Sequence, residues 1–173
     1  MAAIKQIQVA YDAVQDRLLA RLNTDSGQEF RLWLTRRALQ ALWQPLRETL
    51  ARQPAAAALS SAAAQEALLS FRHEQAVAQA DFGARFESRP RVEFPLGKEP
   101  MLAARIVVKP GAKGGLALSF LPPQGQGITL QLGEQLSHGL VRLLLEGHDK
   151  ADWQLGLALA RSGEAPDARS AVH

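Results

Sequence analysis

The sequence predicts an α+β protein in which antiparallel sheets pack on helices, with a strand-strand-strand-helix unit used twice and a long Ala-rich helical insertion between the copies. Shifting the sequence by 98 positions places Gly27 on Gly125 (125 − 27 = 98), and apolar positions then align without a gap. Apolar and polar residues alternate in "RLLARL" and "FRLWL", as in half-buried strands. We therefore predict an internal duplication, divided into repeat 1 (1–53), insertion and crossing (54–100), repeat 2 with a final segment (101–160) and a frayed tail (161–173).

The first copy is expected to contain strands at about Ile4–Tyr11, Arg17–Thr24 and Glu29–Thr35, with turn chemistry in "NTDSGQ". A helix should follow from about Arg36 to Arg52, because apolar residues recur at helical spacing. Pro45 lies inside this helix, where it is expected to kink or split it. The expected apolar stripe consists of Leu39, Leu42, Trp43, Leu46 and Leu50.

The second copy is expected to contain strands at about Leu102–Lys109, Leu116–Leu121 and Gly127–Leu132. "KPGAKGG" and "PPQGQG" supply turns between them. A helix near Glu134–Glu146 completes the copy, and its expected buried residues are Leu136, Leu140, Leu143 and Leu144.

The segment between the copies is rich in alanine, the best helix former, and we predict a helix from about Ala55 to Phe82. A flexible Ala-rich linker is the alternative. The helix is favoured because an apolar stripe persists through Leu68, Phe71, Ala78 and Phe82. A proline-spaced crossing follows, with a short strand at Arg91–Phe94, and Trp153–Ala160 is expected to form a final strand or helix.

Composition bounds the class of protein. The apolar fraction is 47% and the charged fraction 21%, an ordinary globular balance. There is no Cys, so thiolate metal sites, disulfides and cysteine nucleophiles are excluded. The N-terminus has no signal-peptide pattern, and no apolar run is long enough to span a membrane, so we expect a cytoplasmic protein without membrane contact. The net charge of +3 permits an acidic partner without requiring one.

No catalytic motif is present: P-loop, GxGxxG, GxSxG and HExxH patterns are missing. His148 and Asp152 are four residues apart and would share a helix face, but a solvated polar helix end explains them better than a metal site. We therefore expect no catalytic residues, no metal and no cofactor, and a protein that is not an enzyme.

One constellation points to binding. Strand alternation places Leu18, Ala20, Leu22, Phe30, Leu32 and Leu34 on one face of a sheet. The opposite face then carries Arg17, Arg21, Arg31 and Trp33. Cations and a flat ring on a sheet suit single-stranded nucleic acid, with stacking worth ~1–3 kcal/mol per base. A solvated polar face and a protein partner covering Trp33 are the alternatives. The corresponding face of the second copy has fewer cations and no aromatic residue. It holds Arg105, Lys109, Ser119, Thr129 and Gln131.

Arg36 and Arg37 stand at the expected start of the first helix, where acids are normally preferred. The 98-residue shift places Glu134, an acid, opposite Arg36 in the second copy. An anion at this helix end would offset the unfavourable charge. It could be a phosphate of a nucleic acid, or Glu134 itself if the copies pack about a twofold axis, and we expect the internal pair.

The "FRLWLTRR" and "HGLVRLLLE" segments resemble those of a family of short uncharacterised proteobacterial proteins, a resemblance that implies no activity. The repeated unit is also similar in architecture to PUR and whirly-type proteins, whose twisted antiparallel sheets bind single-stranded nucleic acid. Those proteins have four strands per repeat and more aromatic residues, so the similarity is one of architecture alone.

Two functions follow as hypotheses. The first is a single-stranded nucleic-acid-binding module using the Arg/Trp face, with Arg36 and Arg37 as phosphate contacts. The second is a protein-protein adaptor or assembly factor, docking through a sheet edge or the Ala-rich helix. Exposed strand edges must pair with something, so the copies pair with each other or the chain forms a homodimer.

Overall fold

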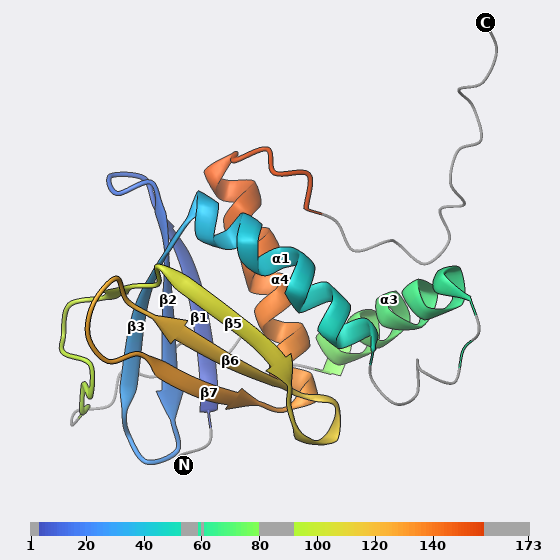
Figure 1. The fold of residues 1–173 in the computed structure, drawn as a ribbon, viewed down its shortest axis with the longest axis horizontal. Helices are drawn as coiled ribbons and strands as arrows, with labels where there is room; N and C mark the ends of the chain where they lie inside the picture. The colour runs from blue at the N-terminus through green and yellow to red at the C-terminus, as the bar shows by residue number, and fades with distance from the viewer. Residues whose placement is uncertain (1–3, 53–58, 60, 80–91, 158–173) are drawn as a thin grey trace, which may run out of the picture.

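The computed structural model describes residues 4–52, 59, 61–79 and 92–157 of the 173-residue chain. Within these residues the fold is α+β, with two antiparallel-rich sheets and three α-helices, as the sequence predicts (Figure 1). The first sheet has the order β1-β2-β3-β4 and the second the order β5-β6-β7.

The first sheet contains β1 (Ile4–Asp12), β2 (Arg17–Thr24), β3 (Glu29–Thr35) and the two-residue β4 (Met101–Leu102). The first three strands are antiparallel and agree with the predicted bounds to within a residue. Strand β4 was not expected as a partner of β3. It pairs parallel to β3, with Leu102 opposite Trp33.

The second sheet contains β5 (Arg105–Pro110), β6 (Leu116–Leu121) and β7 (Ile128–Leu132). The single strand predicted for 102–109 is divided, because the chain changes sheets. Ala103 N–H donates to the Trp33 carbonyl of the first sheet (3.0 Å), and Ala104 N–H donates to the Leu121 carbonyl of the second (2.9 Å). Such a corner joins two sheets around one core.

The two sheets share one strand register. In the first sheet Leu18 lies opposite Leu34, and in the second Leu116 lies opposite Leu132, so each residue is displaced by 98 (116 − 18 = 98; 132 − 34 = 98). The inward residues of β2, β3, β6 and β7 are buried, except Ile128, which is partly buried against the core. The repeated architecture fits the expected duplication, while common origin of the halves stays a prediction.

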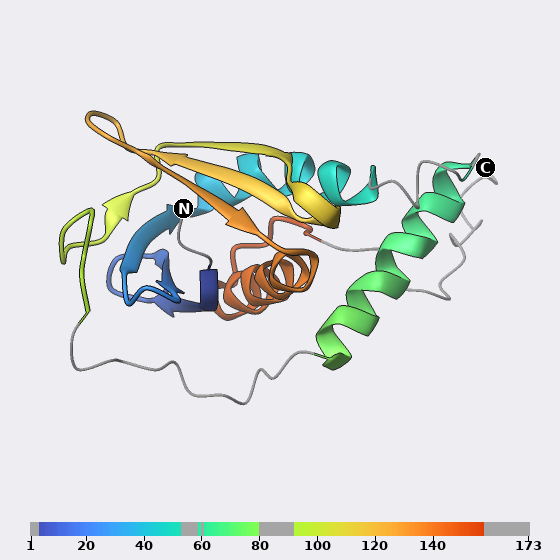
Figure 2. The ribbon, with the colours of Figure 1, turned by 90° about the horizontal axis from the view of Figure 1, so that it is seen from below.

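The helix that ends each half packs on the sheet of the other half. Helix α1 (Arg36–Ala51) follows the first sheet but lies along β5, and α4 (Glu134–Ala151) follows the second sheet but packs against β1. Figure 2 shows α4 nearly end-on in the angle between the sheets. The buried stripe of α1 is the predicted one. Residues of both sheets and both helices form one core cluster, so the two halves share a core.

The insertion contributes α3 (Ala62–Gln79), which packs mainly on α4. Other parts of the helix predicted for 55–82 lie outside the described residues. Its buried residues are Leu69 and Ser70, whereas Phe71 is 57% exposed and Ala78 is exposed as well, so the predicted stripe is wrong at both positions. The reason is that α3 touches its neighbours along one narrow side. Phe82 lies outside the described residues.

Three further expectations need correction. Pro45 does not split α1, because it sits on the exposed side of a helix that continues to Ala51. Helix α4 runs past Glu146 to Ala151. Of its predicted buried residues Leu140 and Leu144 are buried, but Leu136 and Leu143 are half-buried, and Ser137, His138 and Val141 are buried in addition, since α3 covers a second side of the helix. Residues 153–157 form neither strand nor helix; Trp153 is buried and donates from Nε1 to Asp16 Oδ1 (2.8 Å).

Because the core is shared, we predict that a core substitution in either helix destabilises both sheets together. Leu46→Ala in α1 and Leu144→Ala in α4, both fully buried, should each lower the free energy of unfolding by about 2–5 kcal/mol. Urea unfolding followed by far-ultraviolet circular dichroism should remain a single transition in both variants. The exposed Phe71→Ala serves as the control and should change stability by less than about 0.5 kcal/mol. Two separate transitions would show that the sheets fold independently.

Candidate functional site: the outer face of the first sheet

The outer face of the first sheet is organised in cross-strand rows. One row contains Gln8, Arg21 and Arg31, which lie opposite one another on β1, β2 and β3. The next contains Ala10, Leu19, Trp33 and Leu102 and crosses all four strands. A third contains Asp12, Arg17 and Thr35. The predicted site residues on these strands therefore do share a face.

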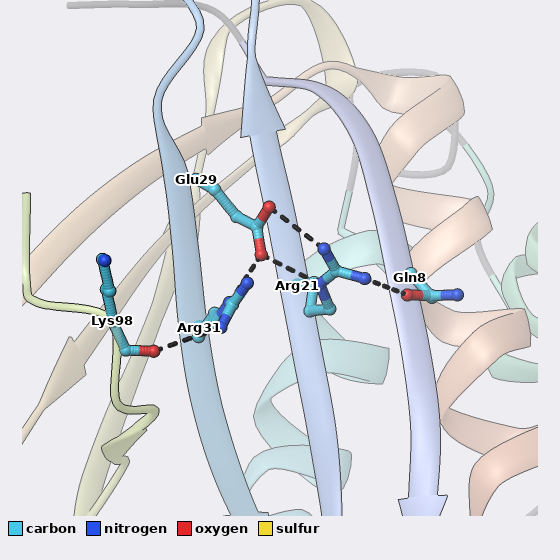
Figure 3. A network of polar contacts seen from close by, with 5 residues as sticks. All are labelled: Gln8, Arg21, Glu29, Arg31 and Lys98. Carbon is cyan, nitrogen blue, oxygen red and sulfur yellow. Dashed lines mark hydrogen bonds and ion pairs between the residues drawn. The ribbon is translucent and has the colours of Figure 1, made fainter. Parts of the chain in front are cut away.

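Arg21 and Arg31 are held by one carboxylate (Figure 3). Arg21 donates from Nε and Nη2 to the two oxygens of Glu29 (2.9 and 3.1 Å), and Arg31 donates from Nε to Glu29 Oε1 (2.6 Å). Arg21 Nη1 also reaches Gln8 Oε1 (3.2 Å). The carboxylate side chain is only 2% exposed. We call these four residues the Glu29 network.

Arg31 has further contacts at the sheet edge. Its Nη1 donates to the Lys98 carbonyl (3.3 Å), and its guanidinium carbon lies 4.6 Å from the centre of the Phe94 ring. A cation over an aromatic face at this distance is attractive. The 92–100 segment therefore fixes the orientation of Arg31 from outside the sheet.

Glu29 is ionised in the folded protein. Burial raises the pKa of its carboxyl, but the hydrogen bonds and charges of Arg21 and Arg31 outweigh burial and leave the pKa lowered. The three ionised groups together carry +1 (+2 − 1). Two of the three arginines predicted on this face thus share one carboxylate, which offsets half of their combined charge.

Trp33 lies in an apolar row. Its cross-strand neighbours on the same face are Leu19 and Leu102, which are half-buried like Trp33 itself, and Ala10 at the end of the row is exposed. We call Ala10, Leu19, Trp33 and Leu102 the apolar row. It separates the Glu29 network from the row containing Asp12 and Arg17.

The two arginines at the start of α1 are both exposed. Thr35 caps the helix, its Oγ1 accepting from Ala38 N–H (3.1 Å). The predicted pairing of Arg36 with Glu134 is wrong, because Glu134 forms an ion pair with Arg72 of α3 (3.5 Å). The internal anion near Arg36 is Asp16. Hydrogen bonds from Trp153 and Tyr11 lower the pKa of Asp16, burial raises it slightly, and the charge of Arg36 lowers it further.

Sequence reasoning missed the residues that decide the chemistry of this face. Glu29 shares the strand parity of Arg31 and Trp33, so alternation could have placed it among the arginines. Leu19 could have been found in the same way, between Arg17 and Arg21. Leu102 and Phe94 could not, because they arrive from a distant segment.

The histidines form a second constellation, between α3 and α4. The ring centres of His73 and His138 are 5.6 Å apart, and neither nitrogen of His138 has a hydrogen-bond partner among the described residues. Burial, the neighbouring His73 and the charge of Arg72 lower the pKa of His138 to about 4. Burial also lowers the pKa of His73, Glu74 raises it, and Arg142 lowers it, with a net lowering. Both imidazoles are therefore neutral at pH 7.

His148 has a structural role. Its Nε2 accepts from Leu155 N–H (3.0 Å), so Nδ1 carries the proton and donates to Asp149 Oδ1 (2.9 Å). With both nitrogens used, His148 holds the 152–157 segment against the end of α4. Asp152, the other half of the pair considered for a metal, is the left-handed C-cap of that helix.

Among the described residues, no group of three His, Cys, Asp or Glu side chains is arranged to hold a metal ion. Nor is any helix in this part of the chain both long and apolar enough to cross a bilayer. No protein family, curated protein or solved structure matches the chain.

The Glu29 network predicts an acid-sensitive contribution to stability. Because the folded-state pKa of Glu29 lies below its ordinary value of 4.5, the contribution is complete above that pH and is lost as pH falls through the folded pKa. Glu29→Gln should cost about 1.5–3 kcal/mol at pH 7, and the difference from wild type should shrink near pH 3. Urea unfolding at both pH values measures this, with the exposed Glu99→Gln as control. An unchanged stability at pH 7 would contradict the role given to Glu29.

The histidine pair predicts a second loss of stability on acidification, which begins at a higher pH than that of the Glu29 network. The pKa of His138 is about 4 in the folded protein against an ordinary 6.5, so docking of α3 is complete above pH 6.5 and weakens as pH falls towards 4. Between pH 7 and 4.5 the loss should be about 2 kcal/mol. Hydrogen exchange should show α3 amides losing protection while β2 and β6 keep theirs, since an isolated helix of this length is marginal.

His138→Phe should keep α3 protected at pH 4.5, because no group remains to be protonated at that position. His148→Gln, at the far end of α4, is the matched control and should leave the pH dependence of α3 unchanged. If α3 lost protection equally in His138→Phe, the histidine would not be responsible.

Proposed function

We propose that this protein is a non-enzymatic binding protein and that its docking surface is the outer face of the first sheet. The observation that carries the proposal is the apolar row, which crosses four strands between two rows of charged and polar side chains. Tryptophan and arginine are the residues most enriched at the energetic centres of protein interfaces. Trp33 and Arg31 stand side by side on β3 with this composition around them.

A protein segment fits this face better than a nucleic acid strand. Summed over Asp12, Arg17, Arg21, Glu29 and Arg31, the face carries +1 (+3 − 2). Arg21 and Arg31 give several of their donors to Glu29, so fewer remain for phosphates. A carboxylate 2% exposed beneath the surface would also repel a polyanion.

The geometry favours a partner that combines an apolar side chain with a carboxylate. The apolar side chain would cover Trp33 between Leu19 and Leu102. The carboxylate would be received by Arg31 or Arg17, which lie in the rows on either side. Because the Glu29 network and Phe94 already fix the guanidinium of Arg31, little side-chain entropy would be lost on binding.

Other surfaces offered by the sequence have weaker support. The edge strands β1 and β7 of the two sheets are in contact but do not pair, since they belong to separate hydrogen-bonded sheets. The Ala-rich α3 presents Phe71 to solvent, but scattered single apolar residues are normal on surfaces.

The test places a photocrosslinking residue at Ala10, the exposed end of the apolar row, in cells that produce the protein. We expect one protein adduct that is lost in Trp33→Ala, and its purified partner should bind wild type at least tenfold more tightly than Trp33→Ala. Arg31→Ala should weaken binding as well, and a crosslinker at Phe71 is the matched control. An adduct that nuclease removes, or one insensitive to Trp33→Ala, would overturn the proposal.

A further inference from the structure

The second sheet has a charge distribution unlike that of the first. From Arg105 to Gly133 the sequence contains the cations Arg105, Lys109 and Lys113 and no Asp or Glu. This stretch includes all three strands of the second sheet and their turns. Among the described residues, none of these cations forms a hydrogen bond or ion pair, in contrast to Arg21 and Arg31.

The strand register places these charges on the outer face. Ile106 and Val108 pack against the core, so Arg105, Val107 and Lys109 point outward. Both cations of β5 are exposed, and Lys113 is exposed in the turn that leads to β6. At about 3.3 Å per residue, Arg105 and Lys109 are ~13 Å apart along β5. The cations therefore follow one edge of the sheet, beside α1 (Figure 1).

The rest of the outer face carries no charge and combines hydroxyl and amide groups with the half-buried apolar side chains of Val107, Ala117 and Leu121. Ser119 and Thr129 lie opposite each other and share a hydrogen bond between their hydroxyls (2.8 Å). Gln131 is exposed one row away, opposite Ala117. Hydroxyl and amide groups both donate and accept, so they suit sugar and base edges as well as phosphate oxygens.

We propose that the outer face of the second sheet binds single-stranded nucleic acid through its phosphates, with Arg105, Lys109 and Lys113 as the contacting cations. A polyanion meets no carboxylate on this face, whereas the first sheet presents Asp12 and Glu29. The site is independent of the docking surface proposed above, since it uses another sheet and other residues.

An unpaired strand fits better than a duplex or a membrane. The B-DNA major groove is about 12 Å wide. Three strands at about 4.8 Å spacing, with their side chains, exceed that width. Membrane anchoring would need exposed large apolar residues, and those found in the described residues, Val14 and Phe71, lie outside this sheet. Without an aromatic ring on the face, binding should depend on length rather than on base identity.

Fluorescence anisotropy of labelled dT20 and dA20 with the full chain provides the test. We expect similar affinity for both oligonucleotides and a slope of log K against log salt of about −2, which is ~0.7 for each of three phosphate contacts. Arg105→Glu combined with Lys109→Glu should weaken binding at least tenfold at low salt. Trp33→Ala should leave it unchanged.

The matched control is Lys150→Glu combined with Lys5→Glu, which makes the same change in net charge on other parts of the molecule. Equal weakening by this control would overturn the proposal, because only overall charge would then matter. Loss of binding in Trp33→Ala would move the site to the first sheet and overturn it as well. Binding to phosphatidylserine vesicles without binding to the oligonucleotides would also overturn the proposal. Circular dichroism of each variant verifies folding, and Lys109→Gln provides a milder substitution if the double variant unfolds.

Discussion

The exchange of helices between the two halves is the constraint on which the structure depends. Each sheet has an apolar inner face that needs a cover, and the helix directly following it in sequence lies on the other sheet instead. Gly147 of α4 lies against the first sheet, where an added Cβ would come within 2.9 Å of Leu18 Cδ2. Since burial of apolar surface is the main driving force of folding, neither half retains its core without the other. The outer faces are then left to the solvent and to partners.

That arrangement explains why the two outer faces can differ so much in chemistry. Inward residues are restricted by a common core, and their register repeats at 98 residues. Outward residues have no such restriction. On the first sheet Glu29 forms ion pairs with two arginines, and an apolar row that contains Trp33 lies beside them. On the second, cations stand along β5 without an acid. One fold thus presents two outer faces of different chemistry, and our two binding proposals rest on that difference.

Much of the fold could be predicted from the sequence because it depends on local periodicity. Strand alternation located β1, β2 and β3, and helical spacing located the buried stripe of α1. The division of the 102–109 strand could not be foreseen, since it depends on hydrogen bonds from Ala103 and Ala104 to two different sheets. The site was predicted in part. Alternation gave the arginines and Trp33 a common face, but the contacts of Arg31 with Phe94 and Lys98 join residues more than sixty positions apart.

The differences between the halves follow from α3, which packs mainly on α4. At the 98-residue spacing, exposed Gln40 of α1 corresponds to His138 of α4, which is 1% exposed (138 − 40 = 98). Leu50 corresponds in the same way to His148. The position that is exposed on α1 is buried on α4 because a second helix, α3, covers it there. Burying an imidazole without hydrogen-bond partners is unfavourable, and it is tolerated here because the ring stays neutral. Packing of α3 thus makes one side of the core polar and sensitive to acid, while the strand register of the two sheets is the same.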